Sequence, residues 1–265
     1  MKRIHLFEFE DFAWFPAWLR NYLTRYLVAV HKLLDSPTLI AELLRKLLNQ
    51  TGSRQLVDLC SGSGGPMLEV LDNLKEEFPT LNLTLSDLYP NEVAAQKLND
   101  QNDSSIHYHL NPVDATKVPS DLPGIRTLIC SFHHLRPQVA QKVLADAVQH
   151  KQPLLVYEIS DNSFPKWLLW LAFPINILTV LIITLTVRPL SVGQIIFTYI
   201  IPVLPIIIAW DGAVSNARTY TLDDLTLLLN DIDSTDYTWE KDTIAGKGGR
   251  KLYLLGRPHP ITPAV

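Results

Sequence analysis

Residues 57–65 read Val-Asp-Leu-Cys-Ser-Gly-Ser-Gly-Gly, and this stretch decides the fold of the chain. The apolar run over 55–60 predicts a strand, and the pattern over 66–78 predicts a helix. A turn of small residues between a strand and a helix lets the backbone approach a ligand closely. Asp58, at the end of the strand, adds one carboxylate that reaches the polar end of such a ligand. The stretch therefore predicts a site for a nucleoside-like cofactor.

The pattern around this stretch alternates between short β-like runs and helical segments. Strands are expected over 55–60, 81–86, 107–110, 127–131 and 154–159, and helices over 66–78, 91–102 and 138–150. This alternation predicts a parallel sheet with crossover helices. Near the C-terminus, a helix over 221–230 precedes two strands, 237–244 and 251–256, that flank a glycine-rich turn as an antiparallel pair. One or two further helices are expected before residue 50.

The composition of the chain limits its domain organisation, its binding partners and its compartment. Its 265 residues are enough for one α/β domain with a large core and an insertion. The net charge of −4 gives no basic bias, which argues against nucleic acid as a partner. Cys60 and Cys130 form no metal-binding pattern and suit a reducing compartment. Glu8, Glu10 and Asp11 interrupt the N-terminal region, so no signal peptide is expected.

Two long segments, 167–187 and 189–210, contain no Asp, Glu, Lys, Arg or His. As helices, each would be about 30 Å long, which is the thickness of a hydrocarbon core. We expect an apolar helical hairpin with Arg188 at its tip and both ends on the side of the sheet domain. The alternatives are a re-entrant pair, kinked by prolines such as Pro174 and Pro202, or a buried helical subdomain or dimer interface.

The order of Asp58 and the glycines separates two kinds of cofactor site. A dinucleotide site takes its acidic residue after the glycines, whereas here Asp58 precedes Gly62 and Gly64. This order resembles the first motif of the class I S-adenosylmethionine-dependent methyltransferases, an acidic residue followed by two variable positions and Gly-x-Gly. The resemblance implies a Rossmann-like sheet, mostly parallel, of seven strands with a final antiparallel strand. It also implies S-adenosyl-L-methionine as cofactor. Cys60 departs from the family, which usually has glycine there.

Three further positions match the same family in the same order. Asp87 ends the second strand, where the family binds the ribose hydroxyls. Asp114, beside Ala115, follows the third strand, where the family binds the adenine amino group. Ser131 ends the fourth strand, next to the methyl donor. The resemblance therefore implies a cofactor-binding set of Asp58, Cys60, Ser61, Gly62, Gly64, Asp87, Leu88, Asp114, Ala115 and Ser131.

The segment after the fourth strand, Ser-Phe-His-His, bears on the methyl acceptor. Amino-group methylases usually carry Asn/Asp-Pro-Pro-Tyr there, while a histidine resembles the small-molecule and lipid methyltransferases. His133 or His134 is expected to deprotonate a hydroxyl, because a near-neutral pKa suits that task. The alternative is that one histidine caps a helix or packs against the cofactor. Glu158 ends the fifth strand on the same edge and is expected to contact the acceptor.

These observations combine into one expected enzyme, a membrane-associated methyltransferase that acts on a lipophilic small molecule or a lipid. Its catalytic domain would lie on the cytoplasmic side of the membrane. The expected regions are a helical lid over 1–50, a methyltransferase domain over 51–160 and 211–257, the apolar hairpin over 161–210 and a tail over 258–265. Two alternatives stay open, a non-catalytic membrane scaffold and a soluble small-molecule methyltransferase that dimerises through the hairpin. The oligomeric state is open as well.

Overall fold

The computed structural model describes residues 1–265 except 13, 102, 164, 166–167 and 260–265. Seven strands of these residues form one sheet in the order β3-β2-β1-β4-β5-β7-β6. Strands β1 to β5 pair in parallel, and β7 runs antiparallel to both β5 and β6. The strands are β1 (Gln55–Asp58), β2 (Asn82–Leu85), β3 (Ile106–Tyr108), β4 (Ile125–Ile129), β5 (Leu154–Glu158), β6 (Tyr237–Gly246) and β7 (Gly249–Pro258). The expected Rossmann-like sheet, mostly parallel with an antiparallel strand at the end of the chain, is confirmed.

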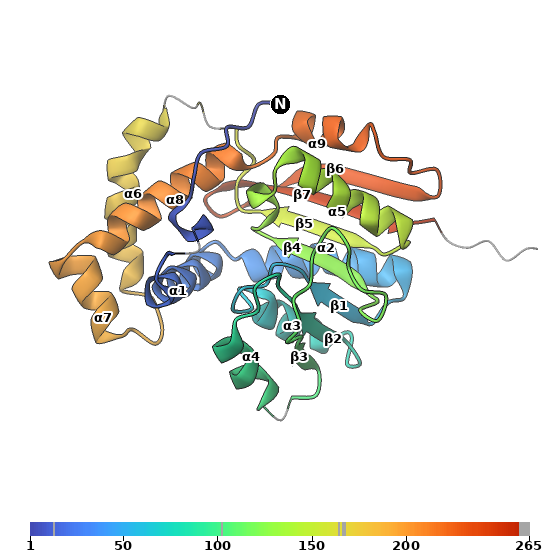
Figure 1. Cartoon of the computed structure of the whole chain (residues 1–265), viewed down its shortest axis with the longest axis horizontal. Coiled ribbons are helices and arrows are strands. Elements are labelled where there is room, and N and C mark those ends of the chain that lie inside the picture. The colour runs from blue at the N-terminus through green and yellow to red at the C-terminus, as the bar shows by residue number, and fades with distance from the viewer. Residues whose placement is uncertain (13, 102, 164, 166–167, 260–265) are drawn as a thin grey trace, which may run out of the picture.

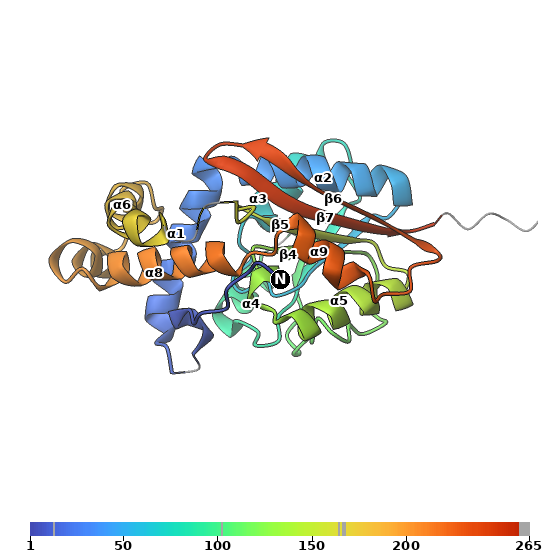
Figure 2. The same cartoon turned by 90° about the horizontal axis from the view of Figure 1, so that it is seen from above.

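Helices cover both faces of the sheet (Figures 1 and 2). One face packs against α2 (Ser36–Thr51), α3 (Met67–Lys75) and α4 (Glu92–Asn99) in a core of leucine and other aliphatic side chains. The other face packs against α5 (Pro137–Gln149) and α9 (Leu222–Leu229). Central strands enclosed on both faces have continuous apolar runs, and Leu154–Tyr157 of β5 is such a run.

Most predicted elements agree with the structure to within a few residues, but the fourth strand is displaced. It was expected over 127–131 and spans Ile125–Ile129. The strand ends at residue 129 because Cys130 has a φ of 51°, a left-handed conformation that cannot continue a strand. The turn carries Ser131 into a short 3₁₀ helix, η2 (Phe132–His134). The two histidines therefore lie on a turn beyond the sheet.

The chain between β5 and α9 forms a helical lobe beside the sheet domain (Figure 1). It consists of α6 (Leu168–Thr184), α7 (Val192–Ile195), the short π-helical segment η3 (Ile196–Ile200) and α8 (Val203–Arg218). Together with α1 (Ala17–Leu33), α6 and α8 build a third core that includes Leu23, Val180 and Leu204. We call α1, α6, α7, η3 and α8 the apolar lobe.

The second apolar segment differs from a straight helix over 189–210. Val192–Ile200 and Val203–Arg218 meet at a bend of 81°, beside Pro202. Among the described residues, no single helix is long and apolar enough to cross a membrane. The two helical segments of the bent pair reach that length and apolar composition only when they are taken together. The start of the first segment, at residue 167, and the tail from residue 260 lie outside the described residues.

The carboxyl ends of β1, β4 and β5 point toward the apolar lobe (Figure 1). Residues 1–12, which include the 3₁₀ turn η1 (Phe9–Asp11), run along α8 beside this edge. Hydrogen bonds to α8 hold them there. Among these, the Ile4 N–H donates to the carbonyl oxygen of Ala217 at 2.8 Å, and the Phe9 N–H donates to Asp211 at 2.9 Å. The N-terminal segment, the strand ends and α8 thus surround one region of the molecule.

Candidate active site

Asp58 lies at the carboxyl end of β1 and is almost fully buried. The sheet register pairs it with Thr127 of β4, whose hydroxyl donates to Asp58 Oδ1. Burial raises the pKa of the Asp58 carboxyl to about 7, although hydrogen bonds from Thr127 and Ser61 act in the opposite direction. A cation beside this carboxylate would favour its ionised form. The predicted contact of Asp58 with an ammonium group would therefore keep its carboxylate ionised.

The small-residue turn after β1 follows a path that glycine permits. Gly62 and Gly64 have φ values of 55° and 97°. A side chain at Gly62 would meet no protein atom within 4 Å, so the space beside that residue is open. Cys60 has a φ of 58°, which explains why glycine would suit its position better than a residue with a Cβ.

Asp87 connects the end of β2 to this turn. Its Oδ2 accepts a hydrogen bond from the Gly62 N–H at 2.8 Å, and its Oδ1 accepts from the Tyr89 N–H at 2.9 Å. Ser61 ties the two strand ends together, because its hydroxyl donates to the carbonyl oxygen of Asp58 and accepts from the Ser86 N–H. The structure thus brings Asp58, Ser61, Gly62 and Asp87 together.

The other predicted cofactor residues lie around this group. The Val113 N–H donates to the Asp87 carbonyl oxygen at 2.9 Å, which brings the loop of Asp114 and Ala115 against the end of β2. The Asp114 side chain is exposed and accepts hydrogen bonds from Thr116, while Ala115 is buried. Leu88 is 42% exposed, and Ser131 is buried with a hydroxyl that has no hydrogen-bond partner among the described residues.

This arrangement fits the cofactor implied by the sequence resemblance. An open space lies beside Gly62, and a buried carboxylate, a partly exposed carboxylate and an unpartnered hydroxyl belong to neighbouring strand ends. Asp58 would hold the amino-acid portion, and Asp87 would hold the ribose. Asp114 is on the side where the adenine would lie. The assignment of these residues to cofactor binding stays a prediction.

His133 and Glu158 form a buried pair at the ends of β4 and β5. Glu158 Oε2 lies 2.8 Å from His133 Nδ1, and Glu158 Oε1 accepts from the His133 N–H at 3.0 Å. A carboxylate can only accept, so Nδ1 carries the hydrogen and Nε2 keeps a free lone pair when the ring is neutral. No described residue hydrogen-bonds to Nε2. Glu158 therefore orients the His133 ring. Both of its carboxylate oxygens contact His133, so Glu158 is a poorer candidate for direct contact with the acceptor.

His134 lies beside His133, with the two ring centroids 4.3 Å apart. Its Nδ1 is 3.2 Å from Asp11 Oδ1, and its side chain is 30% exposed. The structure thus gives each histidine a carboxylate on its Nδ1 side. The three predicted catalytic residues, His133, His134 and Glu158, come together in one cluster, and whether they act in catalysis stays a prediction.

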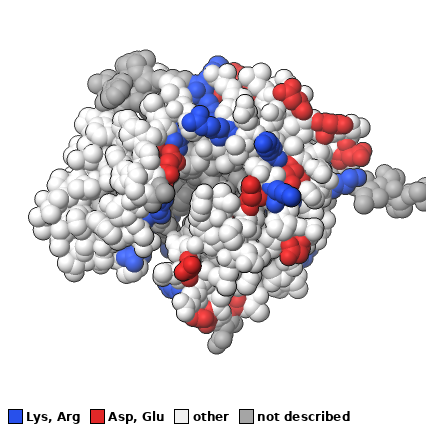
Figure 3. All heavy atoms as spheres, viewed as in Figure 1, with Lys and Arg blue, Asp and Glu red and all other residues white. Residues whose placement is uncertain are grey.

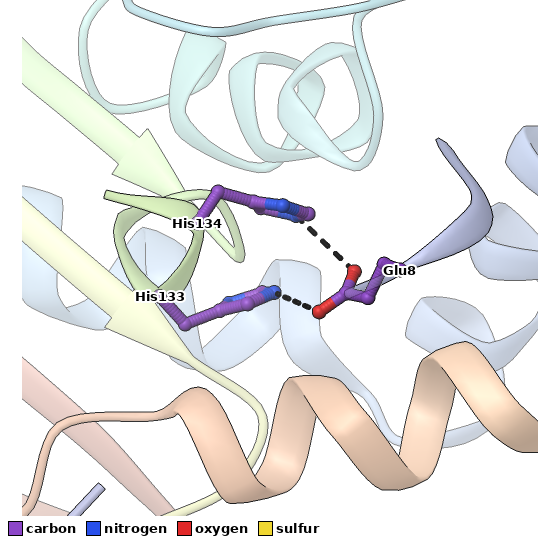
Figure 4. Close-up of side chains that lie close together, drawn as sticks. All are labelled: Glu8, His133 and His134. Carbon is purple, nitrogen blue, oxygen red and sulfur yellow. Dashed lines mark ion pairs between the residues drawn. The ribbon is translucent and has the colours of Figure 1, made fainter. Parts of the chain in front are cut away.

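Glu8 is the residue that sequence reasoning missed. It is fully buried, and its carboxylate lies 3.7 Å from His134 Nε2 and 4.0 Å from His133 Nε2 (Figure 4). Burial raises the pKa of Glu8 to about 7, while His134 and Arg218 lower it. The one signal in the sequence was a lone acidic residue within Leu-Phe-Glu-Phe, which gives no hint of its partners.

Arg218, at the end of α8, fixes the N-terminal segment over the histidines. Its Nη1 lies 3.1 Å from Glu8 Oε1, and its Nη2 pairs with Asp11. Its Nε also donates to the carbonyl oxygen of Leu6 at 2.7 Å. These contacts are those of a structural ion pair rather than of a residue free to bind a phosphate group. Asp161 accepts from Ser163 and forms a local turn.

Comparison with known proteins gives a fold but no sequence family. No protein-family model and no curated protein matches the chain. Among solved structures, the plantazolicin methyltransferase BpumL in complex with SAH superimposes with a TM-score of 0.54 at 11% identity, covering 91% of this chain and 98% of that one. The same enzyme with a monoazolic desmethylPZN analog and SAH gives a TM-score of 0.54 at 11% identity, covering 92% and 98%. The chain therefore has the fold of a methyltransferase that was solved with S-adenosylhomocysteine bound.

Proposed function

We propose that this protein is an S-adenosylmethionine-dependent methyltransferase that methylates a hydroxyl group of a small molecule. The observation that carries the proposal is the pairing of two groups at one sheet edge. Asp58, Gly62 and Asp87 lie together at the ends of β1 and β2, and the space beside Gly62 is open. At the ends of β4 and β5, Glu158 orients His133 with its Nε2 unpartnered. The first group suits the methyl donor and the second suits a nucleophile that must lose a proton.

Each residue then has a task that its surroundings support. When bound, the cofactor supplies a methyl group on a positively charged sulfur, ready for in-line transfer. Asp58 and Asp87 hold the cofactor in position, which is the main contribution of an enzyme to such a reaction. His133 Nε2 accepts the proton of the acceptor hydroxyl as the oxygen attacks, and Glu158 stabilises the resulting imidazolium.

Cofactor binding tests the proposal directly. Calorimetry should detect one S-adenosylmethionine site per chain, and Asp87→Ala should weaken binding by at least about tenfold through loss of charge-assisted hydrogen bonds. Asp121→Ala, which removes an exposed carboxylate elsewhere, is the control and should leave the affinity unchanged. A folded wild-type protein that binds neither the cofactor nor S-adenosylhomocysteine would rule out this function.

The acceptor is proposed to be a small organic molecule with an apolar portion. Its hydroxyl must reach His133, beside Glu8 of the N-terminal segment, and the next residue, Phe9, packs against the apolar core of the lobe. The BpumL structure with a desmethylPZN analog supports this class of acceptor, since that enzyme has the same fold. Incubation with labelled cofactor and cell extracts, followed by mass spectrometry, would identify the product. Label that appears only in protein or nucleic acid would contradict a small-molecule acceptor.

We also propose that the apolar lobe attaches the protein to a membrane, with the sheet domain on the cytoplasmic side. Many of its large apolar side chains are exposed, among them Ile175, Ile182 and Val192 at 62%, 67% and 74%. The face drawn in Figure 3 carries almost no charge over this lobe, and a hollow separates it from the sheet domain. Exposed apolar patches of this kind mark interaction surfaces. The two free cysteines agree with a reducing compartment.

Cell fractionation tests the membrane proposal. The protein is expected in the membrane pellet, and detergent rather than salt should release it, because apolar contacts are insensitive to screening. Complete recovery in the supernatant, as a dimer, would favour the alternative in which the lobe joins two copies of the chain.

A further inference from the structure

We propose that Glu8, His133 and His134 form a binding site for one divalent transition-metal ion, with Zn²⁺ as its simplest occupant. This inference deepens the proposed function, because it assigns a ligand to the histidines at the acceptor side of the site. The three residues come from two distant parts of the chain, the N-terminal segment and η2. Their donor atoms all lie within 4.8 Å of one another (Figure 4).

The donor set is the first argument. Two imidazole nitrogens and one carboxylate are the ligands that Zn²⁺ takes in open sites, and iron, cobalt and manganese accept the same combination. The two distances to Glu8 are 3.7 and 4.0 Å from the His134 and His133 Nε2 atoms. Neighbouring ligands of a tetrahedral zinc, each 2.0–2.1 Å from the metal, lie roughly 3.4 Å apart. The donor atoms are up to 4.8 Å apart, so side-chain rotations that shorten this separation by up to about 1.4 Å would complete the geometry.

The orientation of both histidines is the second and stronger argument. His133 contacts Glu158 through Nδ1, and His134 contacts Asp11 through Nδ1. His133 is thereby left with its Nε2 lone pair on the side of Glu8. His134 has the same tautomer when its Nδ1 donates to Asp11 rather than accepting from Arg218 Nη1, which is 3.4 Å away. A metal-binding histidine characteristically gives its second nitrogen to a carboxylate, which fixes the tautomer and raises the basicity of the ligand atom.

The unsatisfied atoms are the third argument. Glu8 and His133 are 0% and 5% exposed, yet neither oxygen of Glu8 nor Nε2 of His133 has a hydrogen-bond partner among the described residues. Buried polar atoms normally have partners, because an unpaired one costs about 1–3 kcal/mol. Arg218 contributes charge near Glu8 Oε1 but no hydrogen bond, and Glu8 Oε2 faces His134. A cation between the three groups would satisfy all of these atoms.

The site is reachable from solvent, and its three protein ligands leave a coordination position open. His134 is partly exposed, so an ion can enter from its side. Three protein ligands leave at least one position for an oxygen ligand, either water or an oxygen of the acceptor. With the ion bound, His133 Nε2 would coordinate it in place of taking up a proton. The ion would make the acceptor hydroxyl more acidic, and the hydroxyl proton would leave to solvent on the exposed side of His134.

Metal binding is measured on the full chain without reference to activity. After dialysis against EDTA, titration with Zn²⁺ by calorimetry and elemental analysis of the gel-filtered protein should give one ion per chain. Co²⁺ should give the intense visible absorption of a low-coordinate site with nitrogen ligands. Glu8→Gln and His134→Gln should each weaken Zn²⁺ binding by at least about 100-fold, because each removes a ligand atom.

Glu10→Gln is the matched control. It removes a carboxylate from the same turn of the N-terminal segment without removing a proposed ligand, and its affinity for Zn²⁺ should stay within about twofold of the wild type. Thermal melts provide the folding check, since Zn²⁺ should raise the melting temperature of the wild type and of Glu10→Gln but not of Glu8→Gln.

The outcomes separate this site from the proposed function. Absence of stoichiometric Zn²⁺ binding overturns the metal site and leaves His133 as the base. Binding that persists in both Glu8→Gln and His134→Gln also overturns it, because the ion then lies elsewhere. Absence of S-adenosylmethionine binding in calorimetry, with the zinc results as expected, overturns the methyltransferase function and leaves the metal site intact.

Discussion

At the residue scale, burial changes the chemistry of side chains whose sequence context looks ordinary. Asp58 is one acidic residue after a strand, but the sheet encloses it almost completely. Its carboxylate loses contact with water, and this loss favours the protonated form. Glu158 is buried to the same extent but has two hydrogen bonds to His133. Two buried carboxylates thus have different surroundings, and we propose that one binds a cation and that the other positions a histidine.

The first prediction concerns the pH dependence of cofactor binding. The pKa of Asp58 in the free protein is raised to about 7 by burial, and the ammonium group of the cofactor would lower it. The ionised form therefore binds more tightly, and affinity should be highest above pH 7. As the pH falls below 7, the dissociation constant should rise by up to about tenfold per pH unit. Calorimetry from pH 5.5 to 8.5 measures this.

Asp58→Asn separates this effect from other titrations. The variant should bind weakly and with little dependence on pH between 5.5 and 8.5. A wild-type affinity that is constant over this range would show that Asp58 does not contact the ammonium group.

The second prediction concerns Glu158 as a positioning residue. Glu158→Gln removes the charge that holds the Nδ1 hydrogen of His133, and kcat should fall by about 100-fold with little change in the KM for the cofactor. The pH–rate profile should shift as well, because the imidazolium loses its carboxylate partner. Asp161→Asn is the control, since the hydrogen bonds of the Asp161 side chain to described residues are to Ser163, and it should leave kcat and the profile unchanged. Equal losses in both variants would argue against a specific role.

At the element scale, polar contacts between β4 and α5 fix how the helix packs on the sheet. Arg126 of β4 and Asp146 of α5 form a buried ion pair, with 2.6 Å between Nη1 and Oδ2 and side chains 3% and 7% exposed. The Val118 N–H also donates to Asp146 Oδ2, although over 3.4 Å. The pair lies near the amino end of β4, away from the candidate site. It stabilises the fold, and no catalytic role follows from it.

The third prediction follows from this pair. Arg126→Met leaves the buried Asp146 without its guanidinium partner, beside His150 Nδ1 at 3.3 Å and the Val118 N–H, and should reduce the free energy of unfolding by about 3–5 kcal/mol. The double variant Arg126→Met/Asp146→Leu should lose clearly less, because no isolated charge stays behind. Lys75→Met, at the half-exposed Lys75–Asp103 pair, should cost less than about 1 kcal/mol. Urea denaturation measures all three.

At the scale of the whole molecule, α1, α6 and α8 of the apolar lobe pack against one another around a shared core. The lobe nevertheless keeps apolar side chains on its outer surface. Ile175, Leu178 and Ile182 recur at helical spacing on α6 and are 62%, 60% and 67% exposed. A helix that is apolar on its inner and outer sides needs a second apolar partner. Because β5 leads into the lobe and the strand ends point toward it, that partner would lie close to the candidate active site.

The fourth prediction tests this surface. The wild-type chain should float with phosphatidylcholine vesicles in a density gradient, and Ile175→Gln/Leu178→Gln/Ile182→Gln should reduce the floating fraction by at least about fivefold through loss of buried apolar area. The control Val93→Gln/Leu110→Gln removes exposed apolar side chains of the sheet domain and should float like the wild type. A wild-type chain that stays at the bottom of the gradient, as a dimer that the triple variant dissociates, would contradict the membrane proposal.

The sequence by itself determined the sheet, because strand and helix periodicities are local properties of the chain. It also determined which acidic residues end strands: Asp58 and Asp87 come at the end of apolar runs, and parallel strands bring their carboxyl ends to one edge. The bent second apolar segment agrees with the prolines in it. The displaced end of β4 depended on the left-handed Cys130, which has no reliable signal in the residue type.

Only the tertiary structure decided what faces the histidines. Glu8 and Asp11 are more than 120 positions from His133 and His134 in the sequence, and they reach them because Arg218 and Asp211 of α8 hold the N-terminal segment in place. No local pattern encodes such a contact, since it depends on how three separate segments pack against one another. The glycine stretch at 57–65 thus predicts where a cofactor binds, and the packing of the N-terminus over the sheet edge determines the surroundings of the histidines.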